Sequence, residues 1–143
     1  MLAGRLGWNY GHLLRTAEAS PFRDRIHFIE HVRDASLPAL MSAARGFVYP
    51  SLWEGFGLPP LEAMACGTPV VTSAVSSLPE VTGDAALLID PRDVDALADA
   101  LRRIAEDNTL CEELRSKGLR RAAAFTWRNT AELTLRAYAK SLE

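Results

Sequence analysis

The stretch "GFVYPSLWEGFGLPPLEAMACGTPVVTS", residues 46–73, decides the fold class. The apolar run Gly46–Tyr49 predicts a buried strand, Leu58–Cys66 predicts a helix, and Thr68–Ser73 predicts a second strand. A strand, a helix and a strand in this order form the unit from which parallel sheets are built. We therefore expect an α/β fold with a parallel sheet flanked by helices.

The same alternation continues on both sides of this stretch and predicts a Rossmann-like sheet within a single domain. The further elements that we expect are a strand end before Gly4, a helix from after Trp8 to about Ala19, a strand at Ile26–Glu30, a helix with Ser36 as N-cap and Pro38 in its first turn, a short helix at Ser77–Val81 and a strand at Ala86–Ile89.

Beyond Asp90 the pattern predicts helices only, so the fold is expected to end in an all-helical segment. The first of these helices carries apolar residues on one face from Val94 to Ala105, and the second spans about Leu110–Ala123. The third begins near Trp127, and its apolar residues recur every three or four positions. We expect this last helix to pack against another surface.

Composition excludes several classes of protein. The chain has 143 residues, with 16 basic and 18 acidic side chains, and it shows no basic surplus of the kind that binds nucleic acid. Its two cysteines, Cys66 and Cys111, form no Cys-x-x-Cys pair, so neither a disulfide framework nor a zinc site is expected. The sequence shows no signal peptide and no apolar run long enough to span a membrane. A reducing, cytoplasmic location fits these features.

The loop after the strand Gly46–Tyr49 is the best candidate for a ligand site, because open parallel sheets bind ligands outside the carboxyl ends of their strands. Gly55 and Gly57 allow a sharp turn that brings backbone N–H groups close to a ligand. The start of the helix at Leu58 adds unpaired N–H donors and a partial positive charge. These features suit a phosphate or a diphosphate and require no metal ion.

Two carboxylates flank this turn, eight positions apart. Glu54 could hold a sugar hydroxyl or oppose positive charge at a reacting carbon, whereas Glu62, one turn into the helix, could accept two ribose hydroxyls. Each also has a plainer interpretation. Glu62 could complement the helix dipole, and Glu54 could be a solvated loop acid.

Other charged residues are better explained by structure. Asp93–Asp95 resembles a metal-binding Asp-x-Asp, but it follows Pro91 at a helix start, where acids cap backbone N–H groups. His12 and His27 have no partner at a spacing typical of metal ligands. We therefore expect no metal site.

Residues 51–69, "SLWEGFGLPPLEAMACGTP", closely resemble the Glu-x7-Glu motif of the retaining GT-B glycosyltransferases, a family 4-like group of mannosyl- and glucosyltransferases of polysaccharide assembly. Residues 70–101 resemble the stretch that follows this motif, and "AGRLGW" and "LPALMSAARGFVYPS" resemble what precedes it. In that family two Rossmann-like domains face each other. The C-terminal domain binds the nucleotide-sugar donor, and the N-terminal domain supplies most of the acceptor site.

The resemblance implies a role for eight residues. It makes Glu54 the catalytic carboxylate near the donor sugar and Glu62 the ligand of the ribose. The remaining substrate-binding residues that it implies are Ser51, Phe56, Gly57, Leu58, His31 and Val32, of which Phe56, Gly57 and Leu58 would offer backbone N–H groups and His31 and Val32 would border the base.

The resemblance also implies that residues 1–143 form a single nucleotide-sugar-binding domain, truncated at its N-terminus, with the acceptor domain absent. Such a chain would bind a nucleoside-diphosphate sugar without a cofactor, belong to a metal-independent retaining hexosyltransferase and be inactive alone. The absent half could associate peripherally with a membrane, and the last helix could mediate self-association. Two alternatives stay open, namely a nucleotide-sugar epimerase of GT-B architecture and a non-catalytic nucleotide-binding fragment. A guanine nucleotide carrying mannose is a family-level expectation.

Overall fold

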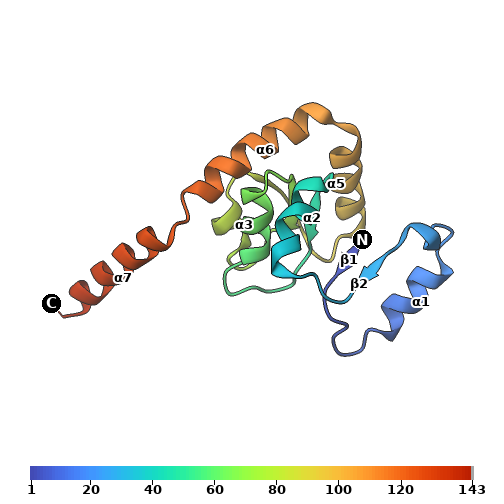
Figure 1. Ribbon diagram of the computed structural model, residues 1–143, viewed down its shortest axis with the longest axis horizontal. Helices are drawn as coiled ribbons and strands as arrows, with labels where there is room; N and C mark the ends of the chain where they lie inside the picture. The colour runs from blue at the N-terminus through green and yellow to red at the C-terminus, as the bar shows by residue number, and fades with distance from the viewer. Residues whose placement is uncertain (143) are drawn as a thin grey trace. The chain divides into compact units, whose positions relative to one another are not determined.

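The computed structural model describes residues 1–142 and divides into two compact units, Met1–Leu37 and a second unit that begins at Pro38 (Figure 1). Both units contain parallel strands and helices, as the sequence predicts. The α/β class with a helical C-terminal segment is therefore confirmed.

The first unit contains a small parallel sheet. Strand β1 (Leu2–Ala3) pairs with strand β2 (Phe28–Ile29), and the N–H of Leu2 donates to the carbonyl of His27 at 2.7 Å. Between the strands lie helix α1 (Gly11–Ala19) and the 3-10 turn η1 (Arg23–Arg25). Both predicted strands are present, but each is only two residues long.

The expected helix cap at Ser36 is wrong. Ser36 is the last residue of the 3-10 turn η2 (Asp34–Ser36), and helix α2 (Leu37–Ala43) follows without a break. The N–H of Ser36 donates to the carbonyl of Arg33 at 2.8 Å, so Ser36 already lies within helical backbone. Pro38 still occupies the first turn of α2, where its missing N–H removes no helical hydrogen bond.

The second unit holds a sheet of three parallel strands in the order β3-β4-β5. The elements are β3 (Phe47–Tyr49), α3 (Leu58–Ala65), β4 (Val70–Ser73), α4 (Leu78–Thr82) and β5 (Ala86–Ile89). Tyr49 pairs with Thr72, and Ser73 pairs with Ile89. The five predicted strands thus all pair in parallel, but their hydrogen bonds form two separate sheets because β1 and β2 pair only with each other.

The core of the second unit joins this sheet to two long helices, α5 (Val94–Glu106) and α6 (Asn108–Ala123). Buried side chains from the sheet and both helices form one cluster: Val71, Ile89, Ala100, Ile104, Cys111 and Leu114. Truncation of a buried leucine such as Leu114 to alanine should therefore cost about 2–5 kcal/mol of stability.

Helix α6 also lies beside α3, as Figure 1 shows. The two helices meet at Gly118, where an added Cβ would be 3.3 Å from Cγ of the fully buried Met64. This close approach fixes α3, whose first turn belongs to the candidate site described below.

The last helix, α7 (Trp127–Ser141), has no buried residue. Its start is set by Thr126, whose Oγ1 accepts a hydrogen bond from the N–H of Asn129 at 3.1 Å. Several large apolar side chains on it are exposed, including Trp127 at 87% and Tyr138 at 65%. The expected apolar face is therefore present, and no other element of residues 1–142 covers it.

Cys66 and Cys111 are both free thiols. Among residues 1–142, no helix combines the length and the apolar character needed to cross a bilayer.

Candidate functional site

Two loops leave the three-stranded sheet at the same edge. Residues 50–57 follow β3, and residues 74–77 follow β4, and because these strands are parallel their carboxyl ends lie side by side. This is the edge at which open α/β sheets bind ligands. The structure thus places the predicted Glu54 loop where a ligand site is expected.

Glu54 is held by the last residue of β3. The phenol of Tyr49 donates a hydrogen bond to Oε1 of Glu54 at 2.7 Å, and both side chains are half-buried. Burial, together with this hydrogen bond and the negative charge of Glu54, raises the pKa of Tyr49 to about 12. The phenol therefore remains protonated, and remains a donor, at neutral pH.

The backbone around Glu54 is held by two serines from the neighbouring loop. The N–H of Glu54 donates to Oγ of Ser76 at 3.0 Å. The hydroxyl of Ser77 is placed to donate to the carbonyls of Glu54 and Phe56, at 3.1 and 2.8 Å. Ser76 adopts a φ of 50°, which is uncommon for a residue with a side chain. The turn that carries Glu54 is thus fastened to the start of α4.

Gly57 is the N-cap of α3 and has a φ of 105°, a conformation that favours glycine. Pro59 and Pro60 follow in the first turn, so two of the donors expected there do not exist. Of the N–H donors predicted at the start of this helix, the first turn therefore supplies that of Leu58. Within residues 1–142, the N–H groups of Phe56, Gly57 and Leu58 have no hydrogen-bond acceptor, and the available donors are concentrated at this one turn.

The other predicted residues of the second unit lie on or beside the same loop. Glu62 is exposed on α3, one turn beyond its start. Ser51 donates from its hydroxyl to the carbonyl of Trp53 at 3.1 Å and so shapes the loop immediately before Glu54. Leu58 opens α3 and is exposed.

His31 and Val32 belong to the first unit, where they follow β2. His31 is exposed and Val32 is half-buried. Their proximity to a bound base stays a prediction.

The acid at Asp93 is a helix cap, as predicted. Its carboxylate accepts a hydrogen bond from the N–H of Ala96 at 2.8 Å at the start of α5. Among residues 1–142, no group of three or more His, Cys, Asp or Glu side chains is arranged to hold a metal ion.

The sequence did not predict that the segment after α6 reaches the Glu54 loop. The rings of Phe56 and Phe125 meet edge to face, with their centroids 5.9 Å apart. The guanidinium of Arg121 lies over the Phe125 ring at 4.9 Å, and its Nε donates to the carbonyl of Val81 at 2.9 Å. Arg121 therefore links α4, Phe125 and the loop.

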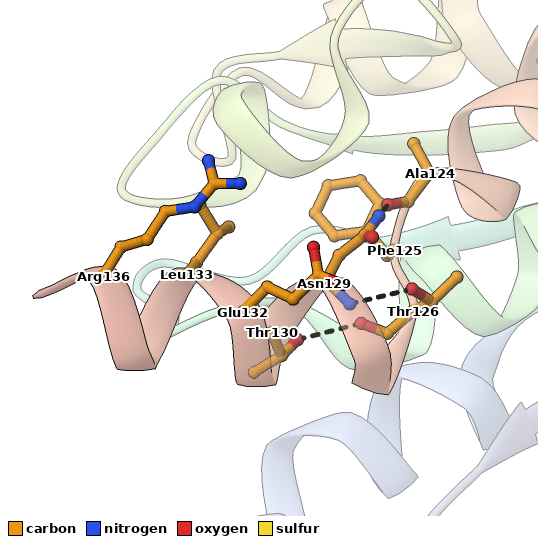
Figure 2. Close-up of a pocket in the computed structure, with 8 residues that line it drawn as sticks. All are labelled: Ala124, Phe125, Thr126, Asn129, Thr130, Glu132, Leu133 and Arg136. Carbon is orange, nitrogen blue, oxygen red and sulfur yellow. Dashed lines mark hydrogen bonds between the residues drawn. The ribbon is translucent and has the colours of Figure 1, made fainter.

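An open cavity of about 380 Å³ lies along the first turns of α7 (Figure 2). Its lining includes Phe125, Leu133 and Arg136, and within it Asn129 donates from Nδ2 to the carbonyl of Ala124 at 2.9 Å. None of the predicted site residues lines this cavity. It adjoins the Glu54 loop only through Phe125, whose ring contacts Phe56.

Tyr49, Ser76 and Ser77 were not among the residues predicted for the site. Their position offers the signal that could have found them, because Tyr49 ends β3 and the two serines follow β4, the next strand along the same edge. What the sequence cannot give is the pairing of each hydroxyl with its hydrogen-bond partner.

A family model described as "Glycosyl transferases group 1" matches residues 3–121. The chain is 46% identical over 138 residues to the O-antigen chain mannosyltransferase B of Escherichia coli, covering 96% of this chain and 36% of that protein. It is 40% identical over 123 residues to the MMP alpha-(1->4)-mannosyltransferase of Mycolicibacterium hassiacum, covering 83% of this chain and 30% of that protein.

Among solved structures, the sucrose-phosphate synthase of Thermosynechococcus elongatus superposes with a TM-score of 0.85 at 33% identity, over 99% of this chain and 38% of that one. The chain therefore spans about a third of the length of these proteins.

Proposed function

The chain belongs to the group 1 glycosyl transferases, and from this premise we propose that it binds the donor substrate of a hexosyltransferase, a nucleoside-diphosphate sugar. The proposed reaction retains the configuration of the transferred hexose and needs neither a metal ion nor a cofactor. The observation that carries the proposal is the Glu54 loop, which presents a fixed carboxylate beside three N–H groups without acceptors among residues 1–142.

The donor's diphosphate would bind at the turn before α3. The N–H groups of Phe56, Gly57 and Leu58 point to an anion as the ligand, because backbone donors at a helix start carry a partial positive charge. These donors can meet the charge of a diphosphate directly, which is the reason for proposing a metal-independent site. Ser51 shapes the same loop through its bond to Trp53.

The two carboxylates would act on different parts of the donor. Glu62 is exposed on α3, where its two oxygens can accept the two ribose hydroxyls. Glu54 would face the hexose, where it could accept a sugar hydroxyl and oppose the positive charge that develops at the reacting carbon. His31 and Val32 would border the base.

Mannose is the proposed hexose, because two relatives that cover most of this chain are named mannosyltransferases. A guanine nucleotide is the proposed carrier. The epimerase alternative is not favoured, since the named relatives are transferases. The acceptor and any association with a membrane would belong to parts of a larger enzyme that this chain does not supply. A cytoplasmic location accords with the two free thiols.

Calorimetric titrations of this chain test the proposal. GDP, UDP and ADP are titrated separately, and each is compared with the corresponding nucleoside monophosphate. We expect GDP to bind more tightly than GMP, because the second phosphate reaches the N–H groups at Gly57. If the base is not guanine, UDP or ADP should show this difference instead. The corresponding nucleotide sugar is then titrated to measure what the sugar adds. If none of the three diphosphates binds, or if the monophosphates bind equally well, the proposed donor site is wrong.

A further inference from the structure

We infer that Tyr49 is a positioning residue that fixes the carboxylate of Glu54 toward the donor sugar. The inference rests on the proposed function, because it assigns to Tyr49 a role in the donor site proposed above. It concerns a contact that the Glu-x7-Glu spacing does not contain, since Tyr49 lies five residues before Glu54, in the strand.

The ring of Tyr49 is itself held in place. It stacks on Phe47, with ring centroids 6.1 Å apart and an angle of 15° between the planes. The backbone carbonyl of Tyr49 accepts a hydrogen bond from Oγ1 of the buried Thr72 at 2.8 Å, which ties this end of β3 to β4. Because the phenol hydroxyl is carried on a fixed ring at the end of a strand, its hydrogen bond gives Glu54 one defined orientation.

The bond engages one oxygen of Glu54 and leaves acceptor positions on the carboxylate for a ligand. Tyr49 donates to Oε1 at 2.7 Å, and an ionised carboxylate can accept about four hydrogen bonds in all. The backbone of Glu54 is separately fastened through Ser76 and Ser77. Both ends of the side chain are thus restrained before a ligand arrives, so little conformational entropy remains to be lost on binding.

The chemical nature of the group that donates the hydrogen bond to Glu54 matters as well. A lysine or an arginine at position 49 would also hold the carboxylate, but it would cancel the negative charge that the proposed reaction uses. A phenol with the ordinary tyrosine pKa of 10.0 is already neutral in the physiological range, and the raised pKa of Tyr49 extends this range upward. Tyr49 therefore orients Glu54 without neutralising it.

The test measures how much the sugar contributes to binding, expressed as the Kd for GDP divided by the Kd for GDP-mannose. If another nucleoside diphosphate and its nucleotide sugar bind more tightly, the same ratio is measured for them. The variants are Tyr49→Phe, Glu54→Ala and the double variant. Thr72→Val is the matched control, because it removes a hydrogen bond to the Tyr49 carbonyl without touching the phenol. Thermal unfolding of every variant reports structural damage separately.

We expect Tyr49→Phe to lower this ratio about threefold to tenfold, which is the net effect typical of losing one hydrogen bond, while the Kd for GDP stays unchanged. In the Glu54→Ala background the same substitution should have no further effect, because Tyr49 acts through Glu54. Thr72→Val should lower the melting temperature and leave the ratio unchanged.

The inference is overturned if Tyr49→Phe leaves the ratio unchanged, if it lowers the ratio equally without Glu54, or if Thr72→Val lowers it as much. A ratio of one in the unaltered chain would overturn it too, since Glu54 would then make no contact with the sugar. Failure of every nucleoside diphosphate to bind is a different result, which removes the proposed function and the inference with it.

Discussion

A Cβ added to Gly57 would lie 2.7 Å from Cδ2 of Leu78, which is the first residue of α4 and fully buried. The turn before α3 and the start of α4 are therefore in direct contact through backbone on one side and a core side chain on the other. Together with the hydrogen bonds that Ser76 accepts and Ser77 donates, this contact fixes the loop that carries Glu54.

The first prediction concerns Gly57→Ala. Its methyl group would overlap Leu78, and its φ of 105° is unfavourable for alanine, so we expect a loss of about 1–3 kcal/mol in the free energy of unfolding. Urea denaturation measures the change. Gly55→Ala is the matched control, because a Cβ there would meet nothing within 4 Å. Equal losses in the two variants would show that the contact with Leu78 carries no weight.

Much of the fold could be predicted from the sequence because it depends on local patterns. The run at Phe47–Tyr49, the apolar stretch at Val70–Ser73 and the cap at Asp93 are read from a few neighbouring residues. Ser36 was assigned wrongly because a serine before an apolar run fits an N-cap and a 3-10 turn equally well. Which strands share one sheet depends on long-range pairing, and no local pattern reveals it.

The candidate site could be predicted only in part, for the same reason. Glu54 and Gly57 were found because their spacing forms a motif and a turn. The bond from Tyr49 depends on how the loop folds back onto the strand end, and the bond from the N–H of Glu54 to Ser76 spans 22 positions of sequence. Phe125 reaches the loop from beyond α6, and only packing brings it to Phe56.

The second prediction is a pH dependence of stability that comes from Tyr49. Its pKa is raised from 10.0 to about 12 in the folded chain, so folding favours the protonated phenol. The stabilisation is fully present below pH 10 and is lost as the pH rises through about 12. We expect the stability advantage of the unaltered chain over Tyr49→Phe to be constant below pH 10 and to shrink above it. Urea denaturation of both proteins across this range provides the measurement, and a difference that does not change with pH would contradict the prediction.

The third prediction concerns the exposed apolar face of α7. Trp127, Leu135 and Tyr138 are exposed by 87%, 67% and 65%, and apolar surface of this kind promotes association. We expect this chain to self-associate as its concentration rises, as sedimentation velocity would detect. Leu135→Arg should weaken the association, whereas Thr134→Arg, which adds the same charge at a polar position, should have little effect. A chain that stays monomeric at high concentration would argue against an interaction surface on α7.

The last prediction separates the two carboxylates. Glu62→Gln should weaken binding of the nucleoside diphosphate with or without its sugar, by about 1 kcal/mol or more, because a neutral amide holds ribose hydroxyls less well than a carboxylate does. Glu112→Gln, on the exposed surface of α6, is the matched control and should leave binding unchanged. Calorimetry with this chain measures both.

Glu54→Gln should behave differently, because its charge is proposed to act on the sugar. Binding of the bare nucleoside diphosphate should stay almost unchanged, yet turnover should fall in a two-domain enzyme that contains this chain, since the carboxylate matters most when the sugar carbon becomes cationic. The amide of glutamine can still accept the hydrogen bond from Tyr49, so the substitution removes the charge while the side chain remains held. The division of roles is wrong if Glu54→Gln and Glu62→Gln weaken binding of the bare nucleotide equally, or if neither affects the binding of any ligand. Glu62 would then only complement the helix dipole, and Glu54 would be a solvated loop acid.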